Sequence, residues 1–183
     1  MNEMHQDDRD QAQALFKRHR GNMIRMHKEG VLQTYKAYDV PKETEAEWTA
    51  ELIDELTKSL SILKTDALEE LEAMYKIGQQ PDIYEGILKF ASKQVLSADS
   101  IVRLIYADTI LNLFKLMRQA PPKETHYKSL QVTTELLEDV IAKPLVLDQG
   151  RELKPYGLSD KKSLNIRARQ SLDEAREVFG RFK

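Results

Sequence analysis

The chain contains no cysteine, and this absence excludes several kinds of chemistry. Disulfide bonds, thiolate metal sites, iron–sulfur clusters and cysteine nucleophiles all require a thiol. Apolar runs of the length needed for a membrane span, about 18 residues, are missing as well. A chain without cysteine fits a reducing compartment. The sequence therefore predicts a cytoplasmic protein with no membrane partner.

Glycine and proline are scarce, with 7 and 6 residues respectively among 183. The glycines are scattered singly, so no glycine-rich loop is present to bind a phosphate. Turn-rich β-folds need more of both residues. Alanine, glutamate, lysine, leucine and arginine dominate instead, and they favour helix. We expect an all-α fold, a bundle of five to seven helices in a single domain that spans residues 1–183.

The predicted domain has four parts, whose boundaries follow the positions of proline and glycine. They are basic N-terminal helices (residues 1–40), a central bundle (41–143), a connection (144–158) and a C-terminal helix (159–183). The connection is long for a compact domain. It contains three consecutive apolar residues, from Leu145 to Leu147, so we expect it to pack across the bundle.

The strongest helical pattern lies between residues 42 and 77, where neither glycine nor proline occurs. Apolar residues recur there every three or four positions from Trp48 to Met74. At about 1.5 Å per residue, one unbroken helix over this range would be roughly 54 Å long. Its apolar stripe would need a partner along its whole length. We therefore expect a homodimer, with a second helical region of the same chain as the alternative partner.

Residues 82–119 form the next helical region, with a polar interruption at Ser97–Ser100. Serine and aspartate cap helices well, so we favour a break there over one continuous helix. The stretch from Ile101 to Met117 is the most apolar of the chain. We expect it to lie at the centre of the bundle.

Asp108 and Asn112 lie one helical turn apart in this apolar stretch, and they form a candidate buried polar site. A buried carboxylate is costly unless it is paired, hydrogen-bonded or bound to a cation. Three interpretations remain open. The favoured one places both side chains on a stripe that faces water. The others are a buried pair with an arginine of another helix, and a binding or catalytic role.

Motifs for metal or cofactor chemistry are absent from the sequence. None of the four histidines follows a glutamate by three positions, the pattern of di-iron helical bundles. The His-Glu-x-x-His pattern of zinc proteases is also missing. We expect no metal and no cofactor, and the catalytic residues of any enzyme stay unknown. An enzyme with a carboxylate-lined pocket in the bundle is the third functional alternative.

Charge is distributed unevenly along the first half of the chain. Between Leu15 and Lys36 there are six basic residues and one acidic residue, a net +5. The basic residues are Lys17, Arg18, Arg20, Arg25, Lys28 and Lys36. Residues 41–80 carry ten acidic and four basic residues, a net −6. We expect the two segments to neutralise each other, with a basic surface for nucleic acid or an acidic partner as the alternative.

The functional expectation rests on long, charged, amphipathic helices without a catalytic motif. Such helices are typical of proteins that act through their surfaces. We therefore expect a helical protein-interaction or regulatory protein, whose protein partner the sequence does not identify. Nucleic-acid binding through the basic Lys17–Lys36 face is the first alternative.

Overall fold

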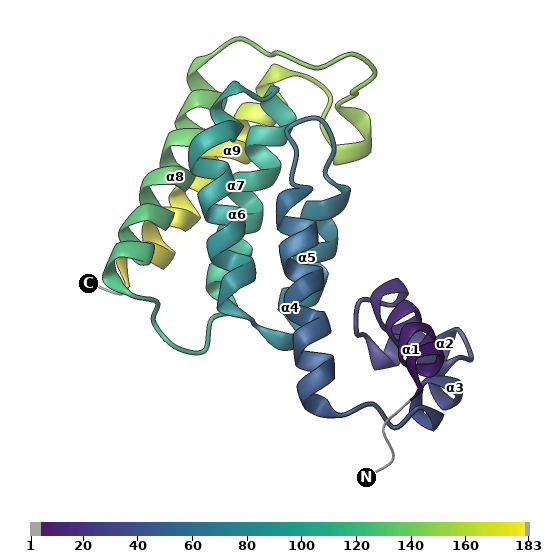
Figure 1. The fold of residues 1–183 in the computed structure, drawn as a ribbon. Helices are drawn as coiled ribbons and strands as arrows, with labels where there is room; N and C mark the ends of the chain where they lie inside the picture. The colour runs from purple at the N-terminus through teal and green to yellow at the C-terminus, as the bar shows by residue number, and fades with distance from the viewer. Residues whose placement is uncertain (1–4, 182–183) are drawn as a thin grey trace. The chain divides into compact units, whose positions relative to one another are not determined.

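The computed structural model describes residues 5–181, and it is all-helical over that range, with no strand (Figure 1). Helix accounts for 74% of the structure. The predicted all-α bundle is confirmed, but the expected five to seven helices are too few, because the described residues form nine α-helices. Residues 1–4 and 182–183, at the ends of the predicted N-terminal and C-terminal parts, lie outside the described range.

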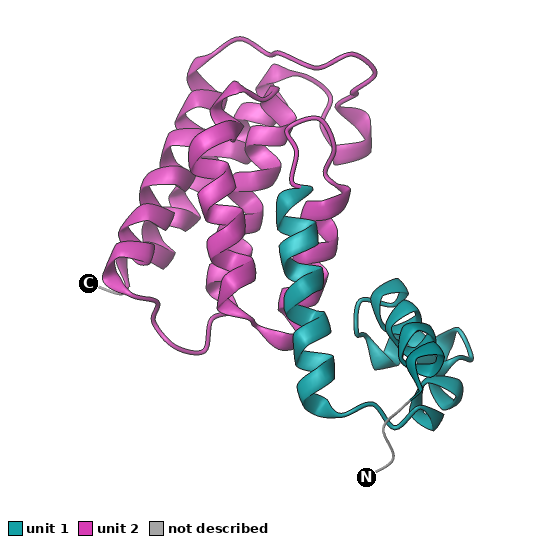
Figure 2. Cartoon of the chain, in the orientation of Figure 1, with its two compact units in different colours: residues 1–59 teal, residues 60–183 magenta. Residues whose placement is uncertain are grey.

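Two compact units make up the chain, residues 1–59 and residues 60–183 (Figure 2). We call them unit 1 and unit 2. The single domain expected over residues 1–183 stays a prediction. Within residues 5–181, no helix combines the length and the apolar character that a bilayer crossing requires.

The described residues of unit 1, 5–59, form four helices around an aromatic core. They are α1 (Gln6–Arg18), α2 (Met23–Lys28), α3 (Leu32–Ala37) and α4 (Lys42–Lys58). Gly21 and Gly30 end α1 and α2 with φ values of 65° and 75°, in the left-handed region that favours glycine. The ring of Phe16 lies 5.6 Å from that of Trp48 and 6.1 Å from that of Tyr35, measured between centroids. These three buried rings hold α1, α3 and α4 together.

The predicted long helix over residues 42–77 is wrong, because the chain breaks between Lys58 and Asp66. Hydroxyl side chains satisfy backbone groups at this break, where they compete with helical hydrogen bonds. Ser59 donates to the carbonyl oxygen of Glu55 at 2.8 Å, and Ser61 accepts the backbone N–H of Leu63 at 3.0 Å. Without the unbroken helix, the sequence-based reason for expecting a homodimer is lost.

Over residues 60–181, unit 2 forms five α-helices and two short 3-10 helices. They are α5 (Asp66–Gly78), α6 (Pro81–Gln94), η1 (Val95–Ser97), α7 (Ser100–Lys115), α8 (Lys123–Ala142), η2 (Lys154–Tyr156) and α9 (Lys161–Gly180). Helix α7 is buried on most of its surface and packs against α8 and α9, so its predicted central position is confirmed (Figure 1). The favoured break before it is confirmed too. Asp99 caps α7 by accepting the backbone N–H of Val102 at 2.9 Å.

The connection over residues 144–158 is attached to the start of α7 by backbone hydrogen bonds rather than by the expected apolar packing, since Val146 is 51% exposed. The backbone N–H of Ser100 donates to the carbonyl oxygen of Val146 at 2.9 Å, and the N–H of Val146 donates to the hydroxyl of Ser100 at 3.0 Å. After the connection, Asp160 caps α9 in a capping box with Ser163. The last helix therefore begins two residues later than the predicted 159.

Candidate functional site

Asp108 projects from α7 towards α9, where two side chains bind its carboxylate. The Oδ2 atom lies 3.0 Å from Nη2 of Arg167, and Oδ1 accepts a hydrogen bond from the hydroxyl of Ser171 at 2.6 Å. The carboxylate is 18% exposed. Asp108 therefore has an arginine partner from another helix, but the pair is not buried, because the side chain of Arg167 is 57% exposed. Asp108 fits neither the expected buried pair nor a side chain that simply faces water.

Asn112 does not belong to a buried polar site, because its side chain is exposed. The predicted pair of residues is therefore divided. Asp108 is bound by side chains of α9, whereas Asn112 faces solvent.

A groove of about 450 Å³ opens beside Asp108, between α7, α9 and the segment that precedes α9. We call it the Asp108 groove. Its apolar lining comes from Leu104, Ile105, Tyr156, Leu158 and Ile166, and its polar lining includes Asp108 and Arg167. Since the guanidinium and the carboxylate neutralise each other, the groove offers mainly apolar surface to a ligand.

Three large apolar side chains beside this groove are strongly exposed. Leu63, Tyr156 and Ile166 are 65%, 42% and 48% exposed. Tyr156 and Ile166 line the Asp108 groove together, and Leu63 and Tyr156 line a neighbouring hollow. Tyr156 therefore borders both hollows, and we call these three residues the apolar strip.

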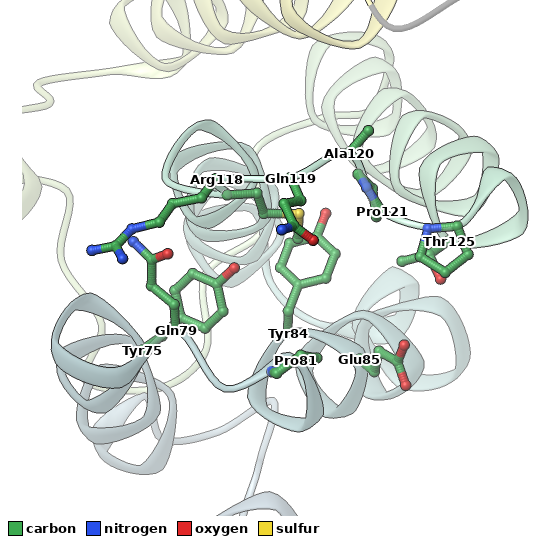
Figure 3. A pocket seen from close by; sticks show the side chains of 12 residues that line it. Tyr75, Gln79, Pro81, Tyr84, Glu85, Arg118, Gln119, Ala120, Pro121 and Thr125 are labelled. Carbon is green, nitrogen blue, oxygen red and sulfur yellow. The ribbon is translucent and has the colours of Figure 1, made fainter.

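A second cavity, of about 380 Å³, lies where the turn between α5 and α6 meets the linker between α7 and α8 (Figure 3). We call it the tyrosine pocket. Tyr75 of α5 and Tyr84 of α6 lie with their ring centroids 6.4 Å apart. Figure 3 shows Arg118 and Gln79 on one side of the two rings and Thr125 on the other.

The floor of the tyrosine pocket is held rigidly. The hydroxyl of Tyr84 donates to the hydroxyl of Ser129 at 2.7 Å, and Ser129 donates to the backbone oxygen of Thr125 at 2.7 Å. Burial raises the pKa of Tyr84 and that of Tyr75 above the ordinary value. Both phenols are therefore neutral near pH 7, and with exposed fractions of 2% and 1% the two tyrosines form the buried floor of the pocket.

Sequence reasoning missed the tyrosine pocket, although its signals are present. Turn residues occur at Gly78–Pro81 and again at Pro121–Pro122. In an antiparallel bundle, two such turns separated by two helices lie at the same end. The tyrosines before and after the first turn, Tyr75 and Tyr84, are then placed at that end too.

The six basic residues predicted as an interaction surface do not form one free face. In unit 1, Nζ of Lys17 lies 2.7 Å from Glu55 and 3.1 Å from Glu51 of α4. The hydrogen bond to Glu55 is the main reason that the pKa of Lys17 is raised. This contact is the expected neutralisation between the basic and the acidic segment.

The other five basic residues differ in their surroundings. Arg25 pairs with Glu29 of the same turn at 3.3 Å, and Arg20 donates to the backbone oxygen of Lys17 at 3.1 Å. Arg18, Lys28 and Lys36 are exposed, and no residue among 5–181 forms an ion pair with them. The part of the basic cluster that stays open to a partner is therefore these three residues.

A group of largely buried charged side chains joins the ends of α7, α8 and α9. The sequence did not indicate these contacts. Arg103 of α7 forms an ion pair with Asp139 of α8 and donates to the backbone oxygen of Ala98 at 2.8 Å. Lys161 of α9 donates to the carbonyl oxygen of Val140. Burial, together with the nearby Arg103, lowers the pKa of Lys161. These contacts give hydrogen-bond donors to backbone carbonyl groups near helix ends, so we assign them a structural role.

Over residues 5–181, histidine, aspartate and glutamate side chains form no group of three or more that could hold a metal ion. Comparison with known proteins adds no further assignment. No protein-family model, no curated protein and no solved structure matches the chain.

Proposed function

We propose that the protein is a helical interaction protein that binds a partner protein through the apolar strip and the Asp108 groove. The exposure of Leu63, Tyr156 and Ile166 around two hollows that share Tyr156 is the observation that carries this proposal. Adjoining apolar side chains of this size mark interaction sites on soluble proteins. Tyrosine is also enriched among the residues that dominate binding energy. The absence of cysteine supports a cytoplasmic place of action.

The groove favours an amphipathic helix of the partner as its occupant. Its apolar wall, which includes Ile105 and Ile166, suits the apolar face of such a helix. Arg167 is exposed at the rim, while its contact with Asp108 leaves the other guanidinium donors directed towards solvent. An acidic residue beside the apolar face of the partner helix would meet these donors.

The apolar strip is also held in place before any partner binds. Arg151 donates from Nη2 to the backbone oxygen of Leu63 at 2.9 Å and from Nη1 to the hydroxyl of Tyr156 at 3.4 Å. One guanidinium therefore connects two of the three strip residues. Binding to a preorganised surface loses less conformational entropy than binding to a mobile one.

Site-specific photo-crosslinking in the native cell tests this proposal. A benzophenone amino acid placed at Tyr156 should give an adduct with one partner protein, and the change Ile166→Asp should abolish it. The same probe at Tyr127, which is also strongly exposed, is the matched control and should not give that adduct. The same adduct from both positions, or none from position 156, would overturn the proposal. An adduct at twice the monomer mass would identify a second copy of the chain as the occupant instead.

Nucleic-acid binding is the second candidate, because Arg18, Lys28 and Lys36 are exposed in unit 1 without ion pairs to residues 5–181. A gel shift that weakens steeply with salt would support it. Replacement of the three residues by glutamine should then remove the shift. A matched triple replacement of Lys154, Lys162 and Arg169, all exposed in unit 2, should leave it unchanged.

A further inference from the structure

We propose that residues 152–158 are an order–disorder switch: they fold and unfold locally, and the partner binds and orders their folded form. We call these residues, which contain η2, the η2 segment. The inference rests on the proposed function, because Tyr156 of this segment belongs to the apolar strip, and Tyr156 and Leu158 line the Asp108 groove. The local unfolding is a property of the chain alone, so it can be tested separately from the partner.

The stretch of chain around the η2 segment has no buried side chain to anchor it. No side chain from Ile141 to Ser163 is fully buried, whereas Val140 before this stretch and Leu164 after it are. Burial of apolar surface is the main favourable contribution to folding. A stretch with so little of it belongs to the least stable part of a folded protein, where local unfolding costs little free energy.

Polar contacts hold the two ends of the η2 segment. Before the segment, the guanidinium of Arg151 is paired with the fully buried carboxylate of Asp99. After it, Asp160 and Ser163 form the capping box that begins α9. Both anchors belong to the helical body of unit 2, so the segment can unfold between them while the helices stay intact.

The middle of the η2 segment is hydrogen-bonded mainly to itself. The backbone N–H groups of Tyr156, Gly157 and Leu158 all donate to carbonyl oxygens inside the segment, at 3.0 to 3.2 Å. Within residues 5–181, a single hydrogen bond connects the segment to the rest of the chain. It runs from Nη1 of Arg151 to the hydroxyl of Tyr156, and at 3.4 Å it is long. The folded form, in which Arg151 holds the apolar strip, therefore depends on one short turn.

Local unfolding would remove one wall from two hollows at once. Tyr156 borders both the Asp108 groove and the neighbouring hollow, and Leu158 lines the groove. When the segment unfolds, Leu63 and Ile166 stay exposed, but the side chain that both hollows share is displaced. A partner that contacts Tyr156 binds the folded form better, so it shifts the population towards that form. Its apparent affinity falls in proportion to the fraction of chains in which the segment is folded.

Amide hydrogen exchange of the full chain, followed by NMR spectroscopy, tests the local unfolding. The N–H groups of Tyr156, Gly157 and Leu158 are hydrogen-bonded in the folded turn, so their exchange reports on its opening. We expect their protection from exchange to be at least about a hundredfold lower than that of Ile110 and Leu111 in the buried centre of α7. Equal protection at the two places would overturn the proposal.

Two glycines with open surroundings allow the turn to be weakened selectively. Gly157 and Gly150 have φ values of 71° and 81°, and a Cβ atom at either position would meet nothing within 4 Å. Gly157→Ala strains the turn of the η2 segment and should lower the protection of its amides about five- to thirtyfold. Gly150→Ala, the matched control, strains a turn before the Arg151 anchor and should leave that protection unchanged.

The amide of Leu172 in α9 is the internal reference, and its protection should be the same in both variants and in the unaltered chain, because the helices stay folded. A Gly157→Ala variant whose η2 segment exchanges no faster would overturn the proposal. So would equal effects of the two glycine changes on that segment.

The covalent complex with the partner tests whether binding orders the segment. A benzophenone amino acid at Leu63, which is exposed and lies outside the η2 segment, should capture the partner in the native cell. In the purified adduct, exchange of residues 152–158, measured by mass spectrometry, should be about tenfold slower than in the free chain or slower still. Residues 117–122, at the tyrosine pocket, are the control and should exchange as before.

The two proposals fail in different ways. An adduct in which residues 152–158 exchange at the rate of the free chain would overturn the switch and leave the proposed function intact. Failure to capture any partner from Leu63 would overturn the proposed function and the coupling to it, whereas the exchange rates of the free chain would still show whether the η2 segment unfolds locally.

Discussion

Asp99 and Arg151 form an ion pair in the interior of unit 2, with 2.5 Å between Oδ2 of the carboxylate and Nε of the guanidinium. The carboxylate is fully buried. It also caps α7 through Val102 and accepts the backbone N–H of Asp148 at 3.1 Å. One side chain therefore joins the start of α7 to the connection over residues 144–158. The same Arg151 holds Leu63 and Tyr156 of the apolar strip, so the buried pair supports the proposed interaction surface.

The change Asp99→Ala should destabilise the fold strongly. It removes a helix cap and leaves the guanidinium of Arg151 without its buried counter-charge, which together cost about 3 to 5 kcal/mol. Denaturation by urea measures the loss. Asp54→Ala is the matched control, because Asp54 pairs with Lys58 on the exposed surface of α4 and should contribute little. Equal losses in the two variants would contradict a buried role for Asp99.

The helix boundaries that could be predicted follow from local chemistry. The segment Ser97–Ser100 predicts a helix break because serine and aspartate satisfy free N–H groups, and Asp99 is the residue of this segment that caps α7. The break after Lys58 was missed because Ser59 and Ser61 satisfy backbone groups there without glycine or proline. Hydroxyl side chains offer the backbone an alternative to the helix, but this effect is weak and does not interrupt the apolar periodicity. Periodicity alone therefore predicted one helix where the chain forms two.

The contacts at the candidate sites could not be predicted from the sequence either, because they join residues that lie far apart along the chain. Asp108 was identified because a carboxylate in an apolar helix needs a partner. That partner, Arg167, lies 59 residues further along the chain, and no sequence spacing connects the two. The tyrosine pocket likewise depends on which turns share one end of unit 2. Such contacts follow from the packing of helices, which a single sequence does not reveal.

The change Asp108→Asn should cost about 1 kcal/mol of stability. The ion pair with Arg167 is partly solvated, so the stability lost with it lies near the upper end of the range for surface ion pairs. The amide oxygen of the new asparagine can still accept the hydrogen bond from Ser171. Urea denaturation distinguishes this outcome from two others. A loss above about 3 kcal/mol would indicate a fully buried pair, and no loss would show that the contact with Arg167 contributes nothing. Asn112→Ala, at an exposed position one turn later, is the control and should change stability little.

Alkaline titration should show four tyrosines that resist ionisation. Burial is the main reason that the pKa of Tyr35, Tyr75, Tyr84 and Tyr106 lies above the ordinary value of 10.0. Tyr35 is further affected by its hydrogen bond to Glu45, at 2.6 Å. Tyrosinate absorbance of the folded protein should therefore rise in two stages, and Tyr84→Phe should reduce only the later one. A single stage near pH 10 for all seven tyrosines would contradict these pKa shifts.

The same shifts predict how stability depends on pH. Above pH 10 the unfolded chain loses its phenolic protons, whereas the folded chain retains four of them. The folded state then binds more protons than the unfolded state, so the free energy of unfolding falls as pH rises. Below pH 10 these groups are protonated in both states, and their contribution is fully present. Urea denaturation between pH 8 and pH 11 should show a decline that begins near pH 10, and a constant stability would contradict it.

Gly21 and Gly30 provide a matched pair for testing the packing of unit 1. Both have a positive φ, so an alanine at either position is strained by about 1 kcal/mol or somewhat more. Only Gly21 is also crowded. A Cβ atom there would lie 2.8 Å from Cζ of Phe16, whereas nothing lies within 4 Å of a Cβ atom at Gly30.

We therefore expect Gly21→Ala to destabilise unit 1 by about 1 to 3 kcal/mol more than Gly30→Ala. The extra loss arises because the ring of Phe16 must move, and this ring packs against Trp48 and Tyr35. Trp48 is the single tryptophan of the chain, so its fluorescence during urea denaturation reports on this core directly. Equal losses in the two variants would show that the Phe16 ring gives way freely, and that the aromatic core of unit 1 is less tightly packed than its ring distances indicate.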